Sequence, residues 1–152
     1  MSALFERLWN WWQARRTRQI TEPAVRERVQ RGADYLDDMD PGWHRRIDPD
    51  ALELENGRRC VLGQLHGEFR LGLGRSGVLS LSSAPRASLS PVAYGFKCVE
   101  GVSDEQQARD YDLLTQAWRG AIRSRWADDI TGGEAPDLET VDEPIPGETV
   151  SA

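Results

Sequence analysis

A run of apolar side chains in the C-terminal half of the sequence recurs at helical spacing for about six turns. Ser103 and Gln106 precede most of it at the spacing of a capping box. Asp104 and Glu105 add negative charge in the first turn, where the helix dipole favours it. The sequence therefore predicts a long amphipathic helix starting near residue 103, with an apolar stripe formed by Ala108, Tyr111, Leu114, Trp118, Ile122 and Trp126.

A second helix is predicted from about Glu22 to Asp38. Thr21 is a suitable N-cap, and Pro23 falls in the first turn, where its missing N–H does no harm. The segment Asp40-Pro41-Gly42 should end this helix, because proline cannot continue the hydrogen-bond ladder and glycine suits a turn. The predicted apolar stripe contains Val25, Val29, Ala33 and Leu36, with Met39 as its extension.

The segment between the two helices is less regular. A short helical turn is expected from Asp48, with Leu52 and Leu54 facing inward, and another short helix from Ser90. From Cys60 we favour a helix followed by a glycine-rich loop. The alternation of polar and apolar residues after Gly67 has the period of a strand, so a short β-hairpin at about 68–81 is the alternative. Together these elements predict a mainly α, small and compact helical domain.

The N-terminal segment, residues 1–19, is rich in tryptophan and arginine. Residues 3–14 predict an amphipathic helix with one broad apolar face. This face suits three surfaces: the chain's own core, a groove on a partner protein, or a membrane interface, where indole rings and arginines lie at headgroup depth. The candidate residues for binding a partner or a membrane are Leu4, Phe5, Leu8, Trp9, Trp11, Trp12, Arg15 and Arg16.

Charge is unevenly distributed along the chain. Residues 128–152 hold eight acidic residues and no base, whereas residues 1–127 carry a net charge of +2. The acidic segment has few large apolar residues, so it cannot bury enough surface to offset the entropy of ordering. We therefore predict an amphipathic helix at 1–19, a helical domain at 21–127 and a disordered acidic tail at 128–152. The chain shows no membrane span or signal peptide, so we expect a cytoplasmic protein, with a peripheral membrane location as the alternative.

Six short motifs occur in the same order as in a known family. They lie between Val25 and Trp118, a span of about 90 residues, and they resemble a family of small uncharacterised proteins common in actinobacteria and their phages. Members often begin near residue 21, so the helix at 1–19 and the acidic tail are additions to this pattern. The resemblance implies a compact, mostly helical, cytoplasmic accessory protein with no established activity. The motifs are Arg31-Gly32-Ala33-Asp34-Tyr35-Leu36-Asp37, Pro41-Gly42-Trp43, Arg46-Ile47-Asp48, Cys60-Val61-Leu62-Gly63-Gln64-Leu65, Ala93-Tyr94-Gly95-Phe96 and Tyr111-Asp112-Leu113-Leu114-Thr115-Gln116-Ala117-Trp118.

None of the candidate chemical motifs predicts an enzyme. The G-x-G-x-x-G run at 72–77 is followed by Val78-Leu79-Ser80-Leu81 and then Pro85, so we do not expect the helix that dinucleotide binding requires to start at Gly77. A zinc site would need ligands from four separate segments, and many family members have a second cysteine where Gly57 stands here. We expect no catalytic residue, no metal and no cofactor, and we expect the two cysteines to be buried free thiols. The four residues that a zinc site would use are His44, Cys60, His66 and Cys98.

The function expected from sequence is that of a non-enzymatic, phage-type accessory protein that binds a host or viral protein through apolar and aromatic anchors. A peripheral membrane protein anchored by residues 1–19 is the alternative. Weak nucleic-acid binding is disfavoured, because a net charge of +2 over residues 1–127 is a poor electrostatic footprint. Its candidate residues are Arg119, Arg123 and Arg125, or alternatively Arg15, Arg16 and Arg18. Association with a second copy of the chain is a further alternative for the aromatic face.

Overall fold

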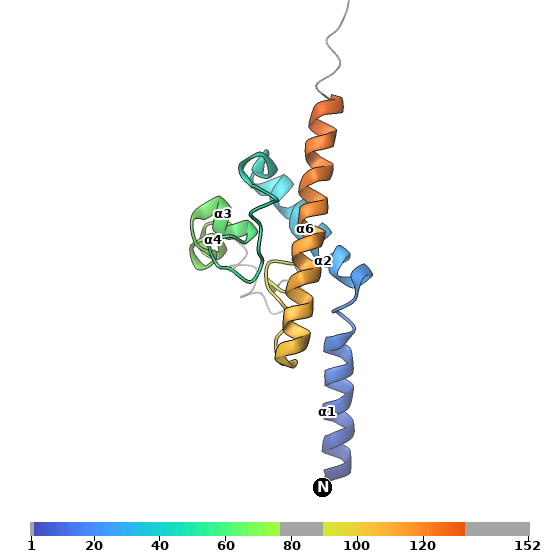
Figure 1. The fold of residues 1–152 in the computed structure, drawn as a ribbon. Helices are drawn as coiled ribbons and strands as arrows, with labels where there is room; N and C mark the ends of the chain where they lie inside the picture. The colour runs from blue at the N-terminus through green and yellow to red at the C-terminus, as the bar shows by residue number, and fades with distance from the viewer. Residues whose placement is uncertain (1, 77–89, 133–152) are drawn as a thin grey trace, which may run out of the picture.

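A computed structural model describes residues 2–76 and 90–132. The molecule is mainly helical, as predicted, and its two longest helices lie against each other (Figure 1). A helix at the N-terminus extends past the N-terminal end of α6, and two short helices lie on the other side of the body. The elements in chain order are α1 (Ser2–Thr17), α2 (Glu22–Met39), the 3-10 helix η1 (Trp43–Arg46), α3 (Val61–His66), α4 (Phe69–Arg75) and α6 (Asp104–Gly132).

Helix α2 follows the predicted pattern closely. The side chain of Thr21 accepts a hydrogen bond from the amide of Ala24 at 3.4 Å and caps the helix. The four residues of the predicted stripe are all buried, but Met39 is 61% exposed, so its assignment to the stripe is wrong. The chain leaves the helix through Gly42, whose φ of +83° is in the left-handed region that glycine tolerates.

Helix α6 begins as predicted and ends later. The Ser103 hydroxyl accepts a hydrogen bond from the amide of Gln106 at 3.2 Å, which is half of the predicted capping box. Leu114, Trp118 and Ile122 have no exposed surface and face α2 and the rest of the core. The helix continues to Gly132, so the predicted start of the tail at 128 is wrong for residues 128–132. The rest of the predicted tail, residues 133–152, lies outside the described residues.

The core between α2 and α6 is built around aromatic rings. Trp43 from η1 packs edge-on against Trp118, with ring centroids 5.8 Å apart. Phe96, from the segment that precedes α6, stacks on the same indole at 5.4 Å. The indole N–H of Trp118 donates to the carbonyl oxygen of Gly95 at 2.7 Å, so this buried polar group has a partner. Such offset and edge-on arrangements are the favoured geometries of aromatic pairs.

The segment predicted as a loop or a hairpin contains a helix. Residues Phe69–Arg75 form α4, so a hairpin arm over 69–75 is wrong, and so is the glycine-rich loop there. The reason is close packing, because a Cβ on Gly72 would lie 2.6 Å from Cβ of Leu62 in α3. Only glycine lets the two short helices approach this closely, and the alternating pattern does not reveal that contact. The remainder of the hairpin, residues 77–81, lies outside the described residues.

Two further short helices predicted from sequence are absent. Residues 48–54 contain a bend at 49–51 and no helix, and residues 91–95 form consecutive turns without a regular helix. Leu52 and Leu54 are nevertheless buried, as expected. The 90–100 segment is instead held by side chains of the two long helices, which bind its backbone carbonyl and amide groups.

A buried ion pair between α2 and α6 holds the 90–100 segment against the two long helices. Arg28 of α2 donates to both carboxylate oxygens of Asp110 of α6 at 2.8 and 3.2 Å, and both side chains are almost fully buried. The same guanidinium donates to the carbonyl oxygens of Gln19, Val92 and Lys97. Asp110 accepts a third hydrogen bond from the backbone amide of Val99 at 2.7 Å, so the charges are both paired and hydrogen-bonded.

Replacing Asp110 with alanine should lower the free energy of unfolding by about 3–5 kcal/mol, because it leaves the Arg28 guanidinium buried without its counter-charge. The matched control is Glu22→Ala, which breaks an exposed ion pair with Arg26 and should cost about 1 kcal/mol or less. Denaturant unfolding of both variants measures the difference. Equal, small losses would contradict the assigned role of the buried pair.

Two glycines in the long helices should respond oppositely to alanine. A Cβ on Gly32 would lie 2.0 Å from the carbonyl oxygen of Tyr94 and 2.9 Å from the Trp118 ring, whereas a Cβ on Gly120 meets nothing within 4 Å. We expect Gly32→Ala to destabilise the protein by about 3 kcal/mol. Gly120→Ala should stabilise it by about 0.5–1 kcal/mol through helix propensity. Thermal unfolding provides the test, and a tolerated Gly32→Ala would contradict this packing of α2 on α6.

Candidate functional site

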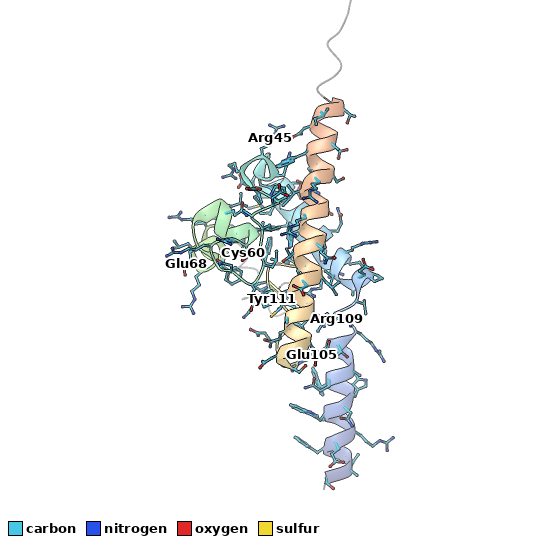
Figure 2. The ribbon with its side chains drawn as sticks, viewed as in Figure 1. Arg45, Cys60, Glu68, Glu105, Arg109 and Tyr111 are labelled. Carbon is cyan, nitrogen blue, oxygen red and sulfur yellow. The ribbon has the colours of Figure 1, made fainter. Side chains whose placement is uncertain are left out.

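The apolar face of α1 is open to solvent along its whole length. Side chains project from its first turns with no other element beside them (Figure 2), and the helix has no buried residue. The alternative in which this face packs on the chain's own core is therefore wrong. The exposed fractions are 81% for Leu4, 68% for Phe5, 54% for Leu8, 55% for Trp9, 51% for Trp11 and 46% for Trp12.

The helix arranges these side chains in a definite order around its axis. At about 100° per residue, the six apolar residues span an arc of about 160°. Leu8 and Trp12 lie near the middle of this arc, and Trp9 and Trp11 lie at its two margins. The Trp11 and Trp12 rings meet edge-on with centroids 5.4 Å apart. We call these six residues the aromatic face of α1.

Basic side chains adjoin the aromatic face at its C-terminal end. The guanidinium of Arg15 lies over the Trp11 ring at 5.6 Å from its centroid, a cation–π geometry. Arg16 lines a shallow hollow of about 330 Å³ between the rings, together with Phe5 and Trp12. The eight predicted binding residues thus lie together on one helix, six on the aromatic face and two at its end.

The body contacts α1 only near the end of the helix, among the contacts that the described residues make. Gln13 donates to the carbonyl oxygen of Gly101 at 3.0 Å, and Arg16 donates to the same oxygen at 3.4 Å. Gly101 has a φ of +73°, and a Cβ there would overlap the Arg16 guanidinium. These two bonds fix the C-terminal end of α1 and leave its first three turns uncovered.

The candidate metal and thiol residues do not form a site in the described part of the chain, where no group of three or more His, Cys, Asp or Glu side chains could hold a metal ion. Cys60 and Cys98 are free and buried, as expected, and burial raises the pKa of both thiols. The Cys60 sulfur caps α3 by accepting from the amide of Gly63 at 3.3 Å. His66 ends α3, and burial lowers its pKa.

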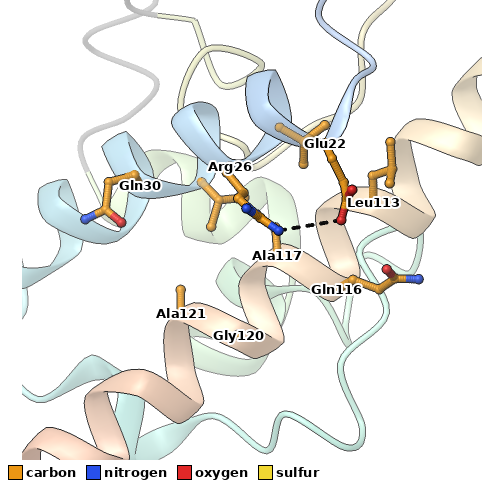
Figure 3. Close-up of a pocket in the computed structure, with 10 residues that line it drawn as sticks. Glu22, Arg26, Gln30, Leu113, Gln116, Ala117, Gly120 and Ala121 are labelled. Atoms are coloured by element: carbon orange, nitrogen blue, oxygen red, sulfur yellow. Dashed lines mark ion pairs between the residues drawn. The ribbon is translucent and has the colours of Figure 1, made fainter.

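A groove of about 430 Å³ runs between α2 and α6 (Figure 3). Small side chains such as Ala117 and Ala121 form one wall, and the ion pair of Arg26 with Glu22, at 3.6 Å, crosses its end. Its ten lining residues, all within the described segments, include no Ser, Thr, Cys, Tyr, His or Asp. The groove therefore offers no hydroxyl, thiol or imidazole for covalent catalysis, and its one carboxylate, Glu22, is paired with Arg26.

Sequence reasoning missed a polar cluster where η1 meets the C-terminal part of α6. His44 lies 2.8 Å from a carboxylate oxygen of Asp129, and Arg45 donates to both oxygens of Asp129 at 2.9 and 3.2 Å. Arg45 lies beside this part of α6 in Figure 2. The arginine lowers the pKa of Asp129 below its usual range. The sequence assigned Asp129 to an acidic tail because its partners His44 and Arg45 lie 85 and 84 positions away in sequence.

The three arginines of α6 that were considered for nucleic-acid binding are already bonded within the molecule. Arg119 donates to the carbonyl oxygens of Pro49 and Leu52 at 2.9 and 3.1 Å. Arg123 pairs with Asp50 at 2.9 Å. Arg125 donates to Asp37 at 2.6 Å and lowers the pKa of that carboxyl, which also accepts from the Trp43 indole. These contacts give the three arginines a structural role.

Comparisons with protein-family models, with curated proteins and with solved structures find no match to this chain. The candidate site is therefore defined by its own geometry, the aromatic face of α1 and the arginines at its end. No helix in residues 2–76 and 90–132 combines the length and the apolar character needed to cross a bilayer.

Acid should weaken the contacts that join η1 and α2 to the end of α6. The pKa values of Asp37 and Asp129 are lower in the folded protein than their unfolded values near 4. Their contribution to stability is therefore present at neutral pH and lost as the pH falls below about 4. We expect the melting temperature, followed by circular dichroism, to fall over this range. The fall should be shallower in an Asp37→Asn, Asp129→Asn variant, and an unchanged slope would contradict these pairings.

Proposed function

We propose that the protein is a small non-enzymatic accessory protein, of the phage type that its sequence resembles, and that it attaches to another macromolecular surface through α1. The observation that carries this proposal is the exposure of all six residues of the aromatic face. Single exposed apolar residues are ordinary on protein surfaces, but a contiguous aromatic patch is typical of a contact surface.

The types of side chain on this face support a binding role. Tryptophan and arginine are enriched among the residues that dominate binding energies at interfaces. Trp9, Trp11 and Trp12 provide large, rigid anchors, and Arg15 and Arg16 provide charged donors beside them. A groove on a partner protein and a membrane surface would both use such a helix.

The attachment of α1 to the body also supports this role. An isolated helix of 16 residues is only marginally stable in water. In the described structure, α1 is fixed near its C-terminal end by Gln13 and Arg16. A surface that covers the aromatic face would stabilise the first turns as well. The segment that carries the family resemblance begins at Val25, so α1 is a binding helix added ahead of that domain.

The double variant Trp9→Gln, Trp12→Gln tests whether the aromatic face is separate from the fold. Because both indoles are exposed, we expect the free energy of unfolding to change by about 0.5 kcal/mol or less. The matched control is Trp118→Ala in the core, which should cost about 3–5 kcal/mol. Denaturant unfolding measures both. A loss comparable to that of Trp118→Ala would show that the face is part of the core and would overturn the proposal.

A further inference from the structure

The charge of the N-terminal segment limits which surface α1 can bind. Residues 1–19 contain four arginines and one glutamate, a net side-chain charge of +3. The whole chain has a net charge of −6, and of the −9 outside this segment −8 lies in residues 128–152, so residues 20–127 carry only −1. The single acid, Glu6, lies on the side of the helix away from the middle of the aromatic face. A surface that covers this face therefore meets positive charge and no carboxylate from α1.

The order of side chains around α1 suits an interface between water and hydrocarbon. Leu8 and Trp12 are near the middle of the aromatic face, where a helix lying in a bilayer surface inserts most deeply. Trp9 and Trp11 lie at the margins, at the depth where indole rings favour the headgroup region. Arg15 follows on the same side, with a long apolar stem that lets its guanidinium group reach phosphate. Apolar and ionic contacts are thus available to one planar surface.

We infer that the surface bound by α1 is an anionic lipid bilayer, with the helix lying in the plane of the interface. This inference rests on the proposed function. Such a helix needs an exposed apolar face and basic residues beside it. Helix α1 has both, and its aromatic face carries no acidic residue. The contacts with Gly101 place the body at the C-terminal end of α1, so its first three turns are clear of the body.

Two protein surfaces fit these observations less well. A second copy would bring two helices of charge +3 together, with no acid on either aromatic face to offset their repulsion. A partner protein would need an apolar groove with a carboxylate placed opposite Arg15. A bilayer that contains anionic lipid provides both properties without a specific geometry.

Vesicle flotation of the full-length protein tests the inference. The vesicles are phosphatidylcholine alone, or phosphatidylcholine with about 30% phosphatidylserine. We expect binding to the anionic vesicles, with a blue shift of tryptophan emission and a loss of binding at high salt. The variant Trp9→Gln, Trp12→Gln should bind about tenfold more weakly or worse, because it loses two inserted rings. The control Asn10→Gln, Ala14→Gln, on the polar side of α1, should bind as the unaltered protein does.

The charge component is tested separately with Arg15→Gln, Arg18→Gln. Each arginine near an anionic surface strengthens binding about fivefold, so the pair should weaken it by about 25-fold. No flotation with anionic vesicles would overturn the lipid inference, and so would a dimer that dissociates in the Trp9→Gln, Trp12→Gln variant. With either result, the proposed function still holds if the Trp9→Gln, Trp12→Gln variant folds normally. Loss of folding in that variant would overturn the proposed function itself.

Discussion

The buried pair of Arg28 and Asp110 connects more parts of this molecule than any other described interaction. One guanidinium satisfies three backbone carbonyls from two segments and both oxygens of one carboxylate. Without it, the irregular 90–100 segment would leave buried polar groups unpaired, which is costly in an apolar core. The position of Gly95 and Phe96 against the Trp118 ring follows from this anchoring. The core therefore depends on a polar contact as much as on its apolar stripes.

The same pair also helps to fix the C-terminal end of α1 on the body. Arg28 binds the carbonyl of Gln19, just after α1, and Asp110 binds the amide of Val99, two residues before Gly101. Ile20 between the two helices is 3% exposed. The C-terminal end of α1 is thus held by segments that are themselves fixed to the core. This rigid base lets a helix with an uncovered apolar face project from the body.

The spacing of apolar residues predicted the long helices α2 and α6. The shorter elements depend on contacts between residues far apart in the sequence. The stripes at 25–36 and 114–122 indicate α2 and α6, because helical periodicity is visible over many residues. Arg28 and Asp110 lie on these same stripes, and two opposite charges at apolar positions were the available signal for the buried pair. The helix at 69–75 was missed because it depends on contact with Leu62. The eight candidate binding residues were chosen from sequence, but their exposure depends on how α1 leaves the body.

Hydrogen exchange at the backbone amides of residues 4–12 measures directly whether α1 is uncovered in the free protein and covered on its target. In the full-length protein alone, these amides should exchange much faster than those of α6, because no other element stabilises the first turns. Anionic vesicles should slow them strongly, and vesicles of phosphatidylcholine alone should not. Slow exchange in the free, dilute protein would contradict an uncovered helix. Unchanged exchange with anionic vesicles would contradict a lipid surface as its target.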